Sequence, residues 1–302
     1  MPELPEVQTT VQGLQILLNK KITNIRIYST KLRYEIPKNI QKILKNSKII
    51  KIYRIGKYIV VNSQNHYSLI FHLGMSGRLR ILKPSTFVNK KHDHFILNTK
   101  KNILIFNDAR RFGFIDLFRT KKISKKHYIS RLGLDALDRK LNERYFRDKI
   151  CKSIVPIKQI LLNQEIVAGI GNIYASEILY DAKISPFTQG CSLTILEIKK
   201  IIKSIKKILR IAINSGGSTL KDYVSVDGTV GNFQNNFKVY NRDGQKRLGH
   251  KIKRIMQCGR PTFYCPDMQL MSKKTHNLIV RQNKKKDDYY FLILDDFPTY
   301  YC

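Results

Sequence analysis

The hydrophobic pattern changes its period near residue 130, and this change limits the fold more than any other feature of the chain. From Ile22 to about Phe118, short runs rich in β-branched and aromatic residues alternate with polar turns, a pattern typical of strands. After Leu134 the apolar residues recur at helical spacing. A length of 302 residues leaves room for two domains, each with its own core. The sequence therefore predicts an α+β protein: a β-sandwich or barrel, then a helical domain.

Individual elements follow from the same periods. Val7, Val11, Leu14 and Leu18 follow Pro5 at helical spacing, which predicts a short amphipathic helix at the N-terminus. Strands are predicted over residues 22–28, 49–61, 67–73, 94–98, 103–106 and 112–118, and helices over 143–152, 156–162, 172–180 and 193–213. Residues 233–240 and 253–264 are expected to pair as a hairpin, and we find no internal repeat.

The charge of the chain favours a polyanionic partner. Lys and Arg number 56 against 22 Asp and Glu, a formal net charge of +34, and neutralised phosphates release condensed counterions. Part of this charge can equally be solvated surface, since Lys, Ile and Asn recur throughout.

We expect a cytoplasmic protein without a membrane segment or a disulfide. No apolar run approaches about 18 residues, the start is acidic, and the five cysteines are scattered.

Five separated motifs indicate a more specific function than composition and charge do. In order along the chain they are MPELPE, HLGMSG, KHDH, DARRFG and GIGNIYASE. Together they resemble the formamidopyrimidine-DNA glycosylase family (Fpg/Nei), and the resemblance extends over most of residues 1–265. It implies an N-terminal β-sandwich catalytic domain at 1–130, a helix–two-turns–helix domain at 131–226 and a C-terminal β-hairpin finger at 227–270. The tail at 271–302 has no counterpart in the family.

The N-terminal motif carries the chemistry. Removal of Met1 would give Pro2 a free secondary amine, whose pKa of about 8 leaves a useful unprotonated fraction at neutral pH. Such an amine can attack the anomeric carbon of a nucleotide and expel its base. Glu3 can shuttle protons, and the resemblance implies that it is the catalytic acid, while Glu6 can accept a hydrogen bond from the extruded base. Taken alone, these residues can also simply start a helix.

Two cations are expected to assist strand cleavage. Lys57, predicted on a strand, matches the family lysine that contacts the lesion-side phosphate and assists β-elimination. Arg260 matches the family arginine that contacts the lesion phosphates and assists δ-elimination. Both roles rest on the resemblance.

A second set is expected to fill the space that a flipped base vacates. Met75 lies in a glycine-flanked loop and can enter that space without demanding hydrogen bonds. Phe112 can wedge between base pairs, and Arg110 can offer its donors to the orphaned cytosine. Arg111 is expected to meet phosphate. The alternative for Met75 is ordinary core packing.

Further residues are expected to hold DNA phosphates. The KHDH motif lacks a distal metal-ligand cluster, which argues against a metal at His92, and the resemblance implies that His92 binds phosphate instead. Asn172 follows Gly169-Ile170-Gly171 at a predicted helix start, where backbone N–H groups bind anions. The resemblance adds Lys152 and Lys158 as phosphate contacts, and places Lys221 in the segment that caps the flipped base.

The expected finger departs from its relatives, which hold zinc with two CxxC pairs. Only Cys265 keeps a ligand position, because Met268 replaces its partner and the segment 244–252 contains no cysteine. We therefore expect no cofactor, since structural zinc needs four protein ligands. His250, Cys258 and Cys265 remain an alternative, improvised site.

The expected function is a bifunctional glycosylase and abasic-site lyase of base excision repair, acting as a monomer on double-stranded DNA that contains oxidised purines, at the bacterial nucleoid. One alternative is an endonuclease-VIII-like glycosylase for oxidised pyrimidines. Leu4, where that branch usually has Gly, and the intact set of Met75, Arg110 and Phe112 argue against it. The other alternative is a decayed homologue that binds damaged DNA without cutting it.

Overall fold

The computed structural model describes residues 1–29, 31–218, 226 and 231–271. The chain divides into two compact units. The first comprises Met1–Leu132 and Arg210–Asn235, and the second comprises Gly133–Leu209 and the chain from Asn236 onward. Within the described residues, no helix is long and apolar enough to cross a membrane.

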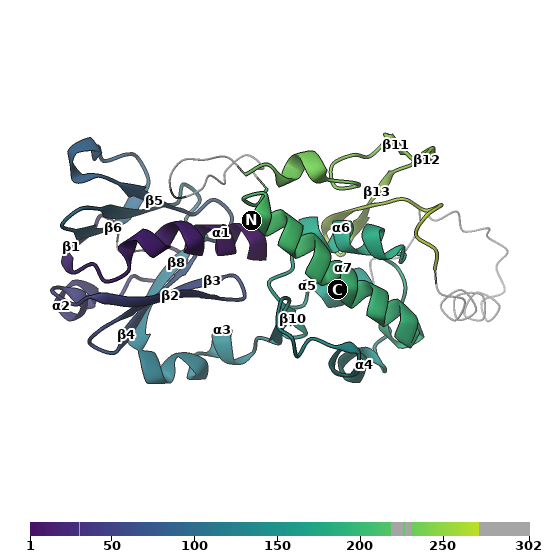
Figure 1. Ribbon diagram of the computed structural model, residues 1–302, viewed down its shortest axis with the longest axis horizontal. Coiled ribbons are helices and arrows are strands. Elements are labelled where there is room, and N and C mark those ends of the chain that lie inside the picture. Colours follow the sequence, from purple (N-terminus) through teal and green to yellow (C-terminus); the bar gives the residue numbers. More distant parts are fainter. Residues whose placement is uncertain (30, 219–225, 227–230, 272–302) are drawn as a thin grey trace. The chain divides into compact units, whose positions relative to one another are not determined.

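The first unit is a sandwich of two antiparallel four-stranded sheets (Figure 1). One sheet has the order β1-β6-β7-β5, from Ile22–Ile27, Asp93–Thr99, Ile103–Asn107 and Arg78–Leu82. The other has the order β2-β3-β4-β8, from Ile49–Ile55, Tyr58–Ser63, Tyr67–His72 and Phe114–Arg119. The helices of this unit are α1 (Leu4–Leu14), α2 (Ile40–Leu44) and α3 (His127–Ser130). The predicted β-sandwich is confirmed.

One apolar core joins both sheets to α1. The ring of Phe71 on β4 lies 5.8 Å from that of Phe95 on β6 and 6.0 Å from that of Phe106 on β7. Val7 and Leu14 of α1 are buried in the same core. Their helical spacing puts them on one face of α1, as the sequence predicts, so the helix is held close to the sheets.

Two details of the strand prediction are wrong. Residues 49–61 form two strands, β2 and β3, because Gly56 takes a left-handed backbone (φ +55°) and turns the chain. Lys57 therefore lies in a hairpin turn and not on a strand. Strand β5 was not predicted at all; its residues Arg78–Leu82 pair with β7.

The second unit is mainly helical. Its helices are α4 (Glu143–Ile150), α5 (Ile157–Leu162), α6 (Asn172–Ala182) and α7 (Ile195–Asn214), of which α7 continues into the first unit from Arg210. Its strands are β9 (Leu134–Asp135), β10 (Val167–Ala168), β11 (Lys246–Arg247), β12 (His250–Lys251), β13 (Lys253–Gln257) and β14 (Arg260–Tyr264). α6 is buried on most of its surface, because Tyr174, Ala175 and Ile178 are apolar on successive faces.

The predicted pairing of residues 233–240 with 253–264 is wrong. Residues 253–264 form a hairpin by themselves, in which β13 pairs with β14. Cys258 and Gly259 make the turn with φ angles of +46° and +67°, the left-handed pair of a tight two-residue hairpin. Phe233–Asn236 is a short 3-10 helix.

Candidate active site

The N-terminus is fixed by the first turn of α1. Pro2 is buried, and Glu3 and Glu6 are 3% and 2% exposed. The backbone N–H of Glu3 donates to Oε2 of Glu6 at 2.9 Å, which satisfies a donor that a helix start would otherwise leave unpaired. Pro2 and Glu3 are therefore held next to one another on an anchored backbone.

Glu6 also reaches a segment more than two hundred residues later. Its Oε1 accepts hydrogen bonds from the backbone N–H of Ser218 at 2.7 Å and from the Ser218 hydroxyl at 2.9 Å. Gly217 (φ +79°) permits this approach, since a Cβ there would lie 3.1 Å from the same oxygen. Lys221, three residues on, lies outside the described residues. Because both Glu6 oxygens already accept hydrogen bonds, a contact to an extruded base would use their remaining lone pairs.

Lys57 lies beside a histidine that the sequence analysis did not single out. The His72 ring stacks on Phe114 with 5.3 Å between ring centres and contacts Tyr58 at 5.0 Å. Desolvation by burial, with the charges of Lys57 and Arg33, lowers the pKa of His72 to about 4. The ring is thus neutral at pH 7, and its Nδ1 accepts the Gly74 N–H at 3.2 Å.

The loop after His72 is joined to the DARRFG loop by the buried carboxylate of Asp108. Its Oδ1 accepts from the Ser76 hydroxyl at 2.6 Å, and its Oδ2 accepts from the Gly113 N–H at 2.7 Å. The Ser76 oxygen in turn accepts from the Arg110 N–H at 3.1 Å. Gly74 makes the close approach possible, since a Cβ there would lie 2.4 Å from the Gly113 nitrogen.

These two joined loops carry the three side chains expected to fill a vacated base position. Met75 and Phe112 are 40% and 45% exposed, so neither packs in the core. The guanidinium carbon of Arg110 lies 4.9 Å from the centre of the Phe112 ring. The loops therefore present two apolar side chains and one planar cation from the same edge of the unit.

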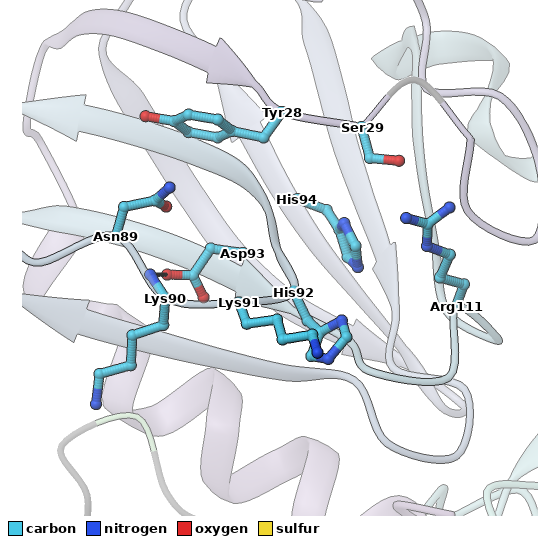
Figure 2. Close-up of a pocket in the computed structure, with 9 residues that line it drawn as sticks. All are labelled: Tyr28, Ser29, Asn89, Lys90, Lys91, His92, Asp93, His94 and Arg111. Carbon is cyan, nitrogen blue, oxygen red and sulfur yellow. Dashed lines mark hydrogen bonds between the residues drawn. The ribbon is translucent and has the colours of Figure 1, made fainter.

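The KHDH motif and Arg111 line an open pocket with a volume of about 450 Å³ (Figure 2). His92 (φ +71°) and Arg111 (φ +56°) both have left-handed backbones. The buried carboxylate of Asp93 accepts from Arg80 at 2.8 and 3.0 Å. The imidazole of His94 is also buried, and its Nε2 lies 2.8 Å from the carbonyl oxygen of Asp108. Asp93 and His94 thus serve the fold, and the cationic lining suits an anion such as phosphate.

The second unit holds four further residues from the sequence analysis. Lys152 and Arg260 are exposed, and Asn172 is the first residue of α6, where its Nδ2 donates to the carbonyl oxygen of Pro261 at 2.9 Å. The prediction that Lys158 contacts phosphate does not agree with the structure, because its side chain is 0% exposed. Its Nζ donates to the carbonyl oxygen of Pro261 at 3.0 Å, inside the unit.

The residues expected around a family zinc ion do not fit one. Cys265 is 0% exposed in an apolar cluster, and Cys258 is exposed at the β13–β14 turn. His250 Nδ1 lies 3.2 Å from a carboxylate oxygen of Asp267. Among the described residues, no three His, Cys, Asp or Glu side chains are grouped to hold a metal. The structure thus does not bring His250, Cys258 and Cys265 together as the alternative site requires.

Sequence reasoning missed His72, Asp108 and Glu177 as residues that position others. All three lie inside the quoted motifs, HLGMSG, DARRFG and GIGNIYASE. That each of them belongs to a motif was the signal in the sequence that could have pointed to a positioning role. Their partners are backbone groups that only the fold brings close.

Replacing Gly74 by Ala should destabilise the protein by more than about 2 kcal/mol, because a left-handed alanine costs about 1 kcal/mol and its Cβ also collides with Gly113. The measurement is the unfolding midpoint in urea. Gly244→Ala is the matched control: its φ is +81°, but no atom lies within 4 Å of the added Cβ. Equal losses in the two variants would contradict the collision.

His72→Asn should make stability less dependent on pH. Since the folded pKa of His72 is lowered from 6.5 to about 4, its contribution is complete above pH 6.5 and is lost as the pH falls towards 4. Asn keeps an acceptor near the Nδ1 position but does not titrate. Melting temperatures between pH 7.5 and 4.5 should fall less steeply in the variant. His66→Asn, at an exposed left-handed turn position, is the control and should keep the wild-type slope.

Comparisons with known proteins agree with this geometry. Residues 1–115 match the model of the formamidopyrimidine-DNA glycosylase N-terminal domain, and residues 132–224 match that of its H2TH domain. Formamidopyrimidine-DNA glycosylases of Zymomonas mobilis and Rickettsia bellii are 44% and 41% identical, over 89% of this chain and 100% and 99% of theirs.

A solved structure is also similar. A Lactococcus lactis Fpg variant in complex with Fapy-dG-containing DNA matches with a TM-score of 0.83 and 34% identity, over 89% of this chain and 99% of that one. Wild-type L. lactis Fpg in complex with DNA containing an oxidised pyrimidine matches with a TM-score of 0.82 over the same shares. By sequence and by fold, the chain belongs to the formamidopyrimidine-DNA glycosylase family.

Proposed function

We propose that this protein is a bifunctional DNA glycosylase and abasic-site lyase that removes oxidised purines from duplex DNA in base excision repair. The observation that carries the proposal is the anchored N-terminus. Pro2 and Glu3 are buried side by side, and the Glu6 carboxylate fixes the backbone that follows them. A nucleophile and a proton carrier are thus adjacent on a rigid helix start.

The chemistry begins when Met1 is removed and Pro2 gains a secondary amine. The amine nitrogen attacks C1′ of the damaged nucleotide, the bond from C1′ to the base breaks, and the base leaves with the electron pair and takes a proton. Glu3 is the proton carrier. Opening of the sugar ring gives an iminium ion between Pro2 and C1′. This cation accepts electrons while C2′ loses a proton and the 3′ phosphate leaves, and a second elimination then releases the 5′ phosphate.

Two cations assist these eliminations. Lys57, beside neutral His72, stabilises the departing phosphate. Arg260 of the second unit is exposed and supports the second elimination. Lys152, just after α4, and Asn172, at the start of α6, add phosphate contacts.

The joined loops open the duplex. Met75 and Phe112 fill the space of the flipped base, and Arg110 donates to the orphaned base. His92 and Arg111, which line the cationic pocket, bind phosphates and carry no sequence information.

Oxidised pyrimidines are the second candidate class of substrate, because the similar L. lactis enzyme was solved with DNA containing one. Leu4 and the set of Met75, Arg110 and Phe112 favour purines. With DNA as partner and bacterial relatives, we place the enzyme at the nucleoid in the cytoplasm.

Borohydride should trap a covalent adduct between processed protein and a duplex with 8-oxoguanine opposite cytosine, because reduction of the iminium makes the bond from Pro2 permanent. The Pro2→Gly variant keeps a primary amine at its N-terminus, so any adduct that it still forms should map to residue 2. Absence of an adduct, or one mapped elsewhere, overturns the proposal. The same assay with an oxidised pyrimidine ranks the two classes of lesion, and binding without trapping indicates a protein that only binds damaged DNA.

Glu3→Gln is the control for the first step. It should abolish base removal and spare part of the cleavage of a preformed abasic site, since only the first reaction expels a base.

Arg110→Ala should weaken the preference for the base opposite the lesion more than it weakens DNA binding in general. We expect the preference to fall by roughly tenfold or more, because one good contact to a base contributes about that much discrimination. Arg111→Ala is the matched change one residue away. It should weaken binding to all duplexes alike and reduce the dependence of Kd on salt. The measurement is Kd and single-turnover rate with each of the four opposite bases. An unchanged preference in Arg110→Ala would refute the role.

A further inference from the structure

The segment that would hold the first pair of zinc ligands closes on itself instead. β11 and β12 pair through Lys246 with Lys251 and Arg247 with His250. Leu248 (φ +48°) and Gly249 (φ +83°) form the two-residue turn between them, the left-handed pair that matches strand twist. Backbone hydrogen bonds between residues 244–245 and 252, at 3.0 and 2.9 Å, complete this small hairpin.

The position of the remaining ligand is occupied by apolar packing. The cluster around Cys265 consists of Tyr180, Val239, Ile252 and Phe263, with Tyr240 and Met268 at its edge. Met268, which stands where a ligand partner would be, accepts a hydrogen bond from the Tyr180 hydroxyl at 3.5 Å. A metal–thiolate centre at this point would have to displace a closed apolar core.

The β13–β14 hairpin is instead joined to the helices by a buried cation. Lys158 of α5 donates to the hydroxyl of Thr262 at 2.6 Å and to the carbonyl oxygen of Pro261 at 3.0 Å. Asn172 of α6 donates to the same carbonyl oxygen at 2.9 Å. Pro261 directly follows Arg260, so two side chains from two helices fix the peptide next to the expected phosphate-binding arginine.

A buried carboxylate holds the chain that leads into the hairpin. Glu177 of α6 is 1% exposed. Its Oε2 accepts the N–H of Lys238 at 2.8 Å, and its Oε1 accepts those of Val239 and Tyr240 at 3.0 and 2.9 Å. Three successive donors on one carboxylate fix this stretch of backbone as a metal-bound loop would.

We propose that the hairpin is held without a zinc ion, by Lys158, Glu177 and the apolar cluster around Cys265, and that Lys158 and Glu177 are positioning residues which set Arg260 for the second elimination. The roles of Arg260 and of the elimination rest on the proposed function. The attachment of the hairpin does not, because it rests on hydrogen bonds within one unit. Lys158 thus acts through the Pro261 peptide and not by binding DNA.

The first test is the metal content and melting temperature of purified protein. We expect far less than one zinc per chain and no change in melting temperature with a chelator. About one zinc per chain, lost on chelation together with several degrees of melting temperature, overturns the proposal. This test needs no activity, so it stands even if the proposed function fails.

The second test separates positioning from stability. Lys158→Met keeps the length of the side chain but removes its donors, and Lys203→Met on the exposed face of α7 is the matched control. The readout is the ratio of δ- to β-elimination products on a preformed abasic site, with the folded fraction verified for each protein. We expect Lys158→Met and Glu177→Gln to lower this ratio by roughly tenfold or more, as Arg260→Ala does, and Lys203→Met to leave it unchanged.

The milder variant Thr262→Val keeps the test decisive if Lys158→Met does not fold. It removes the hydroxyl that receives Lys158 and that donates to Oε1 of Gln257 at 3.1 Å, and it should shift the product ratio in the same direction. A lowered melting temperature with a wild-type product ratio in the folded variants overturns the positioning role. Loss of all cleavage by the wild-type protein would instead count against the proposed function.

Discussion

Buried carboxylates that accept backbone hydrogen bonds hold each part of the structure on which function depends. Glu6 joins the start of α1 to Ser218, and Asp108 joins the two loops that carry Met75 and Phe112. Glu177 does the same for the chain before the β13–β14 hairpin. Around each carboxylate, several hydrogen-bond donors of the protein take the place of water, and these hydrogen bonds offset the cost of burying the charge. Removing one would leave these donors unsatisfied in the interior.

This use of acidic residues also shapes the surface. The chain has 22 acidic residues against 56 Lys and Arg, and Glu3, Glu6, Asp93, Asp108 and Glu177 are all buried. The carboxylates that organise the loops are therefore not on the exposed surface, and with them counted the formal net charge is still +34. A strongly positive field remains for the phosphate backbone, including the pocket lined by His92 and Arg111.

The fold was predictable where the responsible residues are close in sequence. The spacing of Val7 and Leu14 predicted α1, and the alternating runs predicted the sandwich. Pro2 with Glu3, and Arg110 with Phe112, each lie within one short motif, so their roles could be expected from the sequence. Lys158 was assigned to phosphate from the resemblance, and its burial could not be predicted because its partners lie more than a hundred residues later. The hairpin was misplaced because its turn, Cys258-Gly259, was not recognised as the left-handed pair that folds 253–264 back on itself.

The closed β11–β12 turn has a consequence for the conditions in which the protein works. Oxidants that modify guanine also attack thiolates, and a finger held by four metal-bound cysteines can be dismantled by the same species that create the lesion. Here the one thiol at a former ligand position, Cys265, is sealed among apolar side chains away from dissolved oxidants. If the hairpin is held without zinc, as we propose, oxidation of the exposed Cys258 at its turn removes no metal ligand, and the apolar packing around Cys265 is kept.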